Sequence, residues 1–354
     1  MKPPALAPQR YRTPVAALVL GLLLCWAVGL GTWVAPAAHA TTLLERFKER
    51  RDNREPDATA KRSTEQGLWS PYGAREQQTD TVRDGKILRD IAYGNDPKQR
   101  MDVYLPTGGS VWGAAPVIFM VHGGAWRTGD KRMSKVVDNK AARWLPKGFV
   151  FVSVNNRLLP EADPLDQVHD IAQALALAQS RAGRWGANPA QFVLMGHSAG
   201  AHLVALLAAS PTLAAQHGAQ AWLGTIALDS AALDVPTIMQ RRHYRLYDPA
   251  FGTNPTYWAA TSPLQQLHSG AKPLLAVCST RRDDSCSQAQ AFARQAERLG
   301  VRAEVLRQDL SHGDINEQLG LPGDYTAGVE RFMASLSTDV AQRLRETPPD
   351  LTLP

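Results

Sequence analysis

From about residue 86 onward, short apolar runs alternate with longer segments in which apolar residues recur at helical spacing. The apolar runs have the length of buried strands, and a turn-forming GNDP segment between the first two favours an antiparallel start. Strands are predicted at 86–93, 100–105, 116–121, 149–154, 192–195, 222–228, 273–278 and 303–308, and helices at 133–145, 168–185, 201–209, 288–299 and 325–336. Because strands and helices alternate, we predict an α/β protein with a mostly parallel central sheet flanked by helices on both faces.

The alternating part of the chain is interpreted as one domain at 67–336, since about 270 residues suffice for a single large α/β core. Within it the alternation lapses at about 231–271, and we interpret this segment as a small cap-like insertion. The preceding residues, 41–66, carry charges of both signs and few apolar side chains, which predicts a charged linker or an exposed helix. Residues 337–354 are interpreted as a C-terminal tail.

The first 40 residues have the pattern of an export signal. Lys2, Arg10 and Arg12 precede an uncharged apolar run at about 15–34, and the AHA sequence ending at Ala40 offers a cleavage site. We predict a signal peptide at 1–40 and a periplasmic or secreted protein without stable membrane association after cleavage. Because the apolar run is long for a signal peptide, an uncleaved N-terminal membrane anchor is the alternative.

The charge balance argues against a nucleic-acid partner. The chain has 39 Lys and Arg residues and 33 Asp and Glu residues, a net charge of +6. Three of the positive charges precede residue 41 and the first acidic residue is Glu45, so cleavage after Ala40 leaves a net charge of +3. This charge is too small to predict nucleic-acid binding.

A serine bracketed by glycines stands between an apolar run and a segment rich in Ala and Leu. The sequence GHSAG, from Gly196 to Gly200, matches the G-x-S-x-G pattern of a nucleophile elbow, and its strand-then-helix context is the one that the pattern requires. Such a turn strains the serine backbone, and the flanking glycines let the turn close. We therefore predict that Ser198 is a nucleophile.

A serine nucleophile needs a base, and the base needs a carboxylate that orients it. With a nucleophile elbow, the expected chain order is serine, acid, histidine. His312 follows the last predicted strand and is the predicted base. For the acid, the loop after the strand that ends at Cys278 contains two candidates, of which Asp283 is preferred and Asp284 is second; Asp229, after the preceding strand, is third.

Two glycines follow the third predicted strand in the sequence HGGAW, which ends at Trp126. They allow the backbone to approach a substrate closely, so the amides of Gly124 and Ala125, opposite the amide of Ala199, are predicted to form an oxyanion hole. Trp126 is interpreted as a packing residue, with contact to substrate as the alternative.

A basic cluster, Arg241, Arg242 and Arg245, lies inside the cap-like insertion. Guanidinium groups bind carboxylates well, so the cluster is a candidate for binding an acidic part of a substrate. A solvated cap surface is the alternative interpretation, and it is the favoured one.

The segments HGGAW, SVNNRL, GHSAGAHL, RRDDSC and SHGDIN together resemble the α/β-hydrolase superfamily of esterases and lipases. The nearest branch holds carboxylesterases, acetyl and feruloyl esterases and kynurenine-formamidase-like enzymes, and the resemblance covers about residues 89–336. It departs from the family at Asn156, where relatives often have Tyr, which affects the expected pocket wall. The resemblance implies the α/β-hydrolase fold, the triad Ser198, Asp283 and His312, and the oxyanion donors Gly124, Ala125 and Ala199.

The expected activity is hydrolysis of small-molecule carboxylic esters through an acyl-enzyme. Cleavage of amides, peptides or formamides by the same groups is the alternative, and a non-catalytic binding protein is disfavoured because Ser198 and His312 are both present. No metal or nucleotide cofactor is expected, since the sequence has neither a zinc-type Cys and His spacing nor a phosphate-binding glycine loop. The cap and its arginines favour short acyl or small acidic esters.

Two cysteines, Cys278 and Cys286, remain after removal of residues 1–40. They flank one short loop between a strand and a helix, and an exported protein meets an oxidising compartment. We predict a disulfide between them, with two independent thiols as the alternative. The sequence leaves the oligomeric state open.

Overall fold

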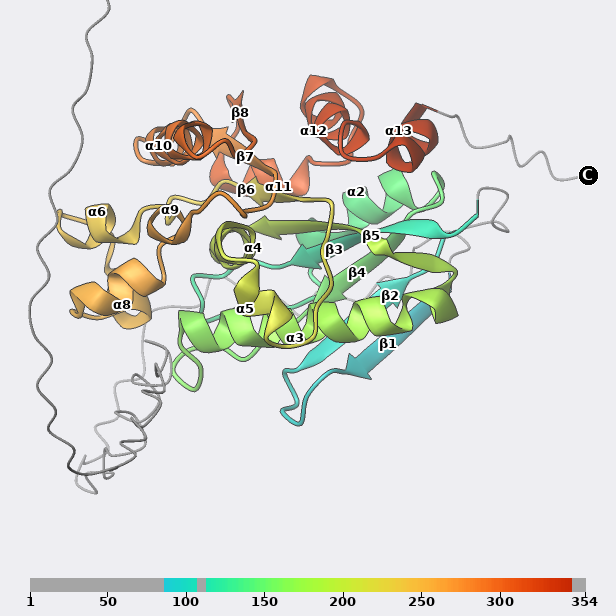
Figure 1. Cartoon of the computed structure of the whole chain (residues 1–354), viewed down its shortest axis with the longest axis horizontal. Coiled ribbons are helices and arrows are strands. Elements are labelled where there is room, and N and C mark those ends of the chain that lie inside the picture. Colours follow the sequence, from blue (N-terminus) through green and yellow to red (C-terminus); the bar gives the residue numbers. More distant parts are fainter. Residues whose placement is uncertain (1–85, 107–112, 346–354) are drawn as a thin grey trace, which may run out of the picture. The chain divides into compact units, whose positions relative to one another are not determined.

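An eight-stranded sheet organises the residues that the computed structural model describes, 86–106 and 113–345 (Figure 1). The strand order is β1-β2-β4-β3-β5-β6-β7-β8; β2 pairs antiparallel with β1 and β4, and all other pairs are parallel. The strands are β1 (Ile87–Ala92), β2 (Arg100–Tyr104), β3 (Ala115–Val121), β4 (Val150–Val154), β5 (Ala187–His197), β6 (Gly224–Leu228), β7 (Leu274–Ser279) and β8 (Ala303–Gln308). The predicted α/β class is confirmed. The predicted signal peptide and linker lie outside the described residues.

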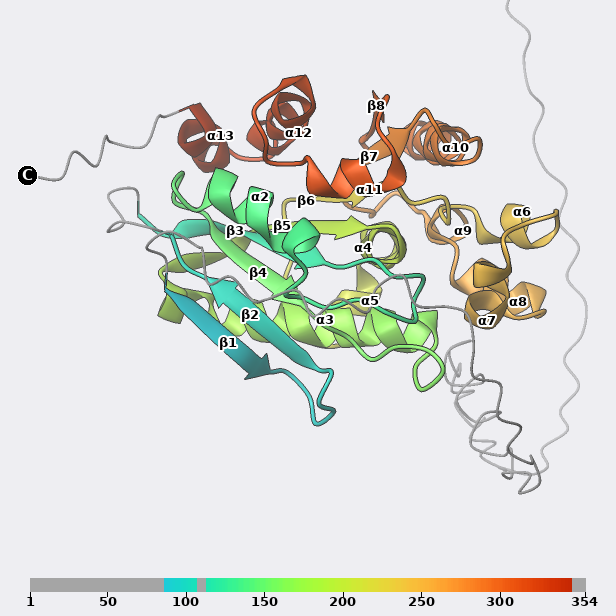
Figure 2. The ribbon, with the colours of Figure 1, turned by 180° about the vertical axis from the view of Figure 1, so that it is seen from behind.

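Helices cover both faces of this sheet. In Figure 1, α2, α12 and α13 lie on one side of the strands and α3 lies on the other; Figure 2 shows the same layers from behind. The helices are α2 (Ser134–Trp144), α3 (Pro164–Arg181), η1 (Ala182–Trp185), α4 (Ala199–Ala209), α5 (Thr212–Ala215), α6 (Val235–Met239), η2 (Arg245–Tyr247), α7 (Asp248–Phe251), α8 (Pro255–Ala260), α9 (Pro263–Gln266), α10 (Ser285–Arg298), α11 (His312–Glu317), α12 (Asp324–Ala334) and α13 (Thr338–Arg345). No helix in these ranges is both long enough and apolar enough to cross a membrane.

The central strands are buried on both faces, which explains their continuous apolar sequences. All seven residues of β3 are buried, as are all residues of β4, β6 and β7. Successive side chains point to opposite faces of a strand. In β7, Leu275 and Val277 therefore join the core under α2, α11 and α12, whereas Ala276 and Cys278 join a second core under α4 and α10.

The predicted insertion contains the short helices α6, η2, α7, α8 and α9 between β6 and β7. It is attached to the sheet domain through aromatic packing. The Trp126 ring, from the loop after β3, lies 5.0 Å from the Phe251 ring and 5.9 Å from the Tyr247 ring, measured between centroids. The insertion therefore packs directly on the HGGAW loop.

The prediction of a tail from residue 337 is wrong for residues 338–345, which form α13. Val340 is completely buried in the core that contains α12, and Leu344, one turn later, packs against the same core. The Arg343 guanidinium donates hydrogen bonds to the carbonyl oxygens of Gly148 and Ala114, at 2.9 and 3.2 Å. Apolar residues four positions apart are typical of an amphipathic helix, but so short a segment carries little pattern.

Candidate active site

Five strand ends bring the candidate residues to one edge of the sheet. The strands β3, β5, β6, β7 and β8 are consecutive in the sheet and parallel, so their carboxyl ends lie together. The loop after β3 carries the HGGAW sequence, Ser198 follows β5, Asp229 follows β6, and His312 lies four residues after β8 at the start of α11. The fold thereby gathers groups that are more than 100 residues apart in the chain.

Ser198 occupies a strained turn between β5 and α4. Its φ is +55°, a left-handed value that a residue with a side chain rarely adopts. The adjoining glycines are required by close backbone contacts. A Cβ atom on Gly196 would lie 2.4 Å from the Gly200 carbonyl oxygen, and a Cβ atom on Gly200 would lie 2.4 Å from the Val121 and His122 carbonyl oxygens. The elbow is confirmed as a structural element.

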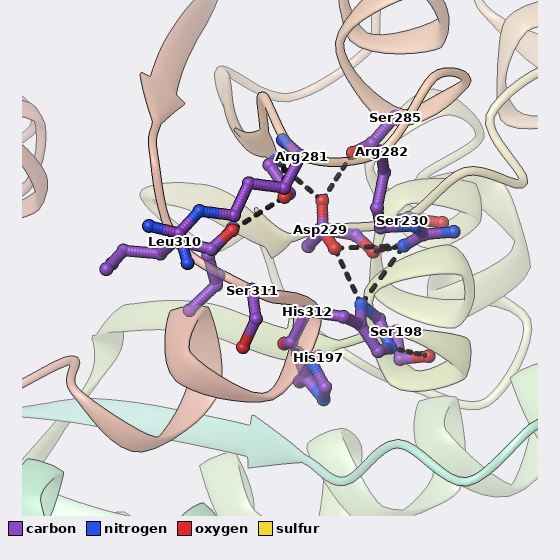
Figure 3. A network of polar contacts seen from close by, with 12 residues as sticks. His197, Ser198, Asp229, Ser230, Arg281, Arg282, Ser285, Leu310, Ser311 and His312 are labelled. Carbon is purple, nitrogen blue, oxygen red and sulfur yellow. Dashed lines mark hydrogen bonds and ion pairs between the residues drawn. The ribbon is translucent and has the colours of Figure 1, made fainter.

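His312 lies between Ser198 and a carboxylate (Figure 3). Its Nε2 is 3.0 Å from Ser198 Oγ, and its Nδ1 is 2.6 Å from Asp229 Oδ2. An ionised carboxylate can only accept hydrogen bonds, so Nδ1 carries the proton and the Nε2 lone pair faces the serine hydroxyl. Ser311 and Asp314 form a capping box at the start of α11, which fixes the backbone that carries His312.

The carboxylate beside His312 is that of Asp229; the preference for Asp283 is wrong for this contact. Asp283 is exposed, and Asp284 lies 3.5 Å from the Arg282 guanidinium. The loop after β7 turns both acids away and directs Arg282 at the triad instead. Asp229 reaches His312 because it directly follows β6, the neighbour of the strand that carries Ser198.

Asp229 is ionised although its side chain has no solvent exposure. Burial alone raises the pKa of a carboxyl group. Here the hydrogen bond from His312, the positive charge of Arg282 and hydrogen bonds from the Ser285 hydroxyl and the Ser279 amide outweigh burial and hold the pKa of Asp229 well below its ordinary value. The site therefore keeps a negative charge against the imidazole.

His197 contacts His312 through a hydrogen bond and through its ring. Its Nε2 donates a hydrogen bond of 2.9 Å to the His312 carbonyl oxygen, and the two ring centroids are 4.5 Å apart. Burial, and next the neighbouring His312, lower the pKa of His197 to about 3, so its ring is neutral near pH 7. His197 is therefore a neutral residue that holds the backbone of His312.

The HGGAW loop lies against the serine. A Cβ atom on Gly123 would be 3.0 Å from Ser198 Cβ, and the next residue but one, Ala125, has a left-handed φ of +51°. His122 Nδ1 lies 2.8 Å from the Gly123 carbonyl oxygen and holds the turn. Trp126 is 4% exposed and its indole donates to His202 Nδ1 at 3.1 Å, which makes it a packing residue.

Comparisons with known proteins match this architecture. A truncated carbohydrate esterase from gut microbiota superposes with a TM-score of 0.62 at 17% identity, covering 72% of this chain and 96% of that one. The chain has the α/β-hydrolase fold. Its residues 101–232 match the BD-FAE family model.

Several curated proteins are also similar to this chain in sequence. The probable isoprenylcysteine alpha-carbonyl methylesterase ICME of Oryza sativa subsp. japonica is 32% identical over 120 residues, 34% of this chain and 28% of that protein. Esterase LipQ of Mycobacterium tuberculosis is 27% identical over 238 residues, 59% of this chain and 55% of that protein. The chain thus spans between about a quarter and about half of the length of these relatives.

The basic cluster of the cap-like insertion faces solvent. Arg241, Arg242 and Arg245 are exposed between α6 and the end of η2. His243, in the same segment, pairs with Asp248 at 2.9 Å. Binding of an acidic substrate by the arginines stays a prediction.

Among residues 86–106 and 113–345, no three His, Cys, Asp or Glu side chains are grouped so as to hold a metal ion. The arrangement of Ser198, His312 and Asp229 suits attack by a serine on an electrophilic centre, with proton transfer to a histidine.

Labelling with a serine-reactive fluorophosphonate distinguishes Asp229 from Asp283 as the acid. It needs no knowledge of the substrate. Asp229→Asn is expected to slow labelling of Ser198 by about three orders of magnitude, because an amide at this position stabilises the wrong tautomer of His312. Asp283→Asn is the matched control and is expected to label at the rate of the unchanged protein. Slow labelling of Asp283→Asn together with fast labelling of Asp229→Asn would show that Asp283 is the acid.

Proposed function

We propose that this protein is a serine hydrolase that cleaves carboxylic esters through an acyl-enzyme on the triad Ser198, His312 and Asp229. The observation that carries the proposal is the continuous line of contacts from Ser198 Oγ to His312 and on to Asp229, at 3.0 and 2.6 Å. It is supported by the strained elbow that presents the serine.

In the proposed first half-reaction, Ser198 Oγ attacks the ester carbonyl carbon and passes its proton to His312 Nε2. Asp229 stabilises the imidazolium that forms, because it is ionised and accepts the Nδ1 proton. The tetrahedral intermediate then collapses: the carbon–oxygen bond to the alcohol breaks, and the alcohol leaves with the proton from Nε2. Water repeats the sequence on the acyl-enzyme and releases the acid.

The oxyanion of the tetrahedral intermediate needs hydrogen-bond donors that are already in place. Ala199 is the first residue of α4, so its amide has no acceptor within the helix and points out of the helix N-terminus. Gly124 and Ala125 follow Gly123, which lies against Ser198. We assign the backbone amides of Ala199, Gly124 and Ala125 to the oxyanion hole.

Ester rather than amide cleavage is favoured by what the similar proteins are called. The relatives and the structural neighbour described above carry names of esterases and a methylesterase. An amidase or formamidase with the same triad is the second candidate, since acyl transfer to serine is common to both reactions.

A panel of p-nitrophenyl esters of rising acyl length, with matched anilides and carboxylate-bearing esters, tests the activity. We expect hydrolysis of the short esters, little or no hydrolysis of the anilides, and a loss of kcat by about three orders of magnitude or more in Ser198→Ala. Ser180→Ala, at an exposed serine of α3, is the matched control. Ester turnover in Ser198→Ala near that of the unchanged protein would contradict the proposal.

We further propose that Cys278 and Cys286 form a disulfide. Their Cα atoms are 5.0 Å apart and their sulfur atoms lie within bonding distance. The closed loop contains Ser279, Arg282 and Ser285, which contact Asp229. The proposed bridge therefore holds the loop that surrounds Asp229, the acid that follows the neighbouring strand.

Reduction of this disulfide is expected to slow ester turnover several-fold before the protein unfolds, because the loop around Asp229 loosens. On the chain-entropy model the bridge stabilises the fold by about 2.5 kcal/mol. Activity and circular dichroism are followed together during titration with a reductant, and Cys278→Ala/Cys286→Ala is the insensitive control. Alkylation of two cysteines in unfolded, unreduced protein would show that the bridge does not form.

Export is proposed from the signal-like pattern of residues 1–40 and is supported by the paired cysteines, which suit an oxidising compartment. We expect the mature protein to begin at Thr41. Intact mass of the protein recovered from the periplasm or medium measures this directly. A membrane-bound product that retains residues 1–40 would support the anchor instead.

A further inference from the structure

The loop between β7 and α10 provides most of the surroundings of Asp229. The Ser279 amide donates to Oδ1 at 2.8 Å, and the Ser285 hydroxyl donates to the same oxygen. Arg282 Nη1 donates to Oδ2 at 2.9 Å and to the Asp229 carbonyl oxygen at 3.1 Å. The Ser279 hydroxyl also donates to the Leu310 carbonyl oxygen at 2.6 Å, two residues before His312. One loop thus positions the acid and the segment that carries the base.

Arg282 differs from the other donors because it is charged and also reaches the base. Its Nη1 lies 3.0 Å from His312 Nδ1 (Figure 3). That nitrogen carries the proton directed at Asp229, so this approach is not a hydrogen bond. It places a permanent positive charge beside the imidazole, at a side chain that is 23% exposed and therefore only partly screened by water.

This charge acts on the carboxylate beside the base. It favours the ionised Asp229 and holds its Oδ2, which helps to orient the imidazole. Because Asp229 accepts the proton of Nδ1, a carboxylate held in this place also keeps the Nε2 lone pair directed at Ser198.

We propose that Arg282 is a positioning residue for the reaction at Ser198: its guanidinium group fixes Asp229 against His312. The proposal rests on the proposed serine hydrolase function, and it assigns a role to the β7 loop in which the sequence analysis expected the acid.

The other charged or titratable groups near these residues do not account for the same effect. His312 faces Asp229, Arg282 and His197; burial keeps His197 neutral, with its pKa at about 3, across the range where a histidine base titrates. Arg282 additionally faces Asp284 at 3.5 Å and Tyr247 of η2. Burial raises the pKa of Tyr247 to about 12, so this phenol also stays neutral.

The rate of Ser198 labelling by a fluorophosphonate tests the proposal without requiring a substrate. Arg282→Gln removes a charge-assisted hydrogen bond to Asp229, so labelling is expected to slow about tenfold. Arg282→Lys keeps a charge and a donor without the planar geometry, so it is expected to recover part of that rate. In the Asp229→Asn protein, Arg282→Gln is expected to have little further effect, because Arg282 acts through the carboxylate.

Arg281→Gln is the matched control. Arg281 is exposed, adjacent in sequence, and paired with Asp309 at 2.8 Å, so its labelling rate should be unchanged. Arg282→Met is the second neutral variant, for use if Arg282→Gln fails to fold as judged by circular dichroism. A neutral variant that labels at the rate of the unchanged protein, or that slows the Asp229→Asn protein about tenfold as well, would overturn the proposal.

If the ester hydrolase proposal fails, the experiments give a different result. The unchanged protein then labels with the fluorophosphonate but hydrolyses no ester in the panel. The Arg282 comparison can still be made in that case, because labelling reports the reactivity of Ser198 itself.

Discussion

A carboxylate that loses all of its water must find other hydrogen-bond donors, or it takes up a proton and loses its charge. Asp229 meets this requirement at the end of β6, where its side chain has no solvent exposure. Four side-chain or backbone donors, from His312, Arg282, Ser285 and Ser279, converge on its two oxygens. The position of His312 relative to Ser198 depends on this carboxylate, and so does the chemistry proposed for the site.

The donors come from elements that the sheet topology alone brings together. β6, β7 and β8 are consecutive parallel strands, and their carboxyl ends supply the acid, the surrounding loop and the base. On the other side of β5, the loop after β3 lies against Ser198 in left-handed backbone conformations. Strained residues persist only where the surrounding packing holds them, and here the packing of Trp126 beneath the cap helices supplies that support.

The loop after β7 differs from the prediction made for it. The resemblance to the α/β-hydrolase superfamily implied that this loop carries the acid of the triad. In this chain it carries a cation and two serines directed at an aspartate that follows the adjacent strand, and the sulfur atoms of Cys278 and Cys286, near its two ends, lie within bonding distance. The acid and its surrounding loop are thus separate parts of the fold, held together by the pairing of β6 with β7.

The sequence by itself determined the alternation of strands and helices, the elbow at Ser198 and the late position of His312. These are local features: strand length, glycine spacing and chain order are visible without knowing which strands are neighbours. Likewise the packing role of Trp126 was anticipated from a short segment. The disulfide between Cys278 and Cys286 stays a prediction, which the distance between their sulfur atoms supports.

Only the tertiary structure decided between Asp229 and Asp283, and only it revealed Arg282. Both aspartates follow a buried strand, so their local sequences are equivalent candidates. The distinction depends on which side chain the backbone directs inward: Asp229 leaves β6 with a left-handed φ of +54° and enters the site, whereas the loop after β7 exposes Asp283 and turns Arg282 inward. The helix at 338–345 was missed for a similar reason, since burial of Val340 depends on a core assembled from distant elements. Contacts between distant segments are set by sheet order and packing, which a single sequence does not display.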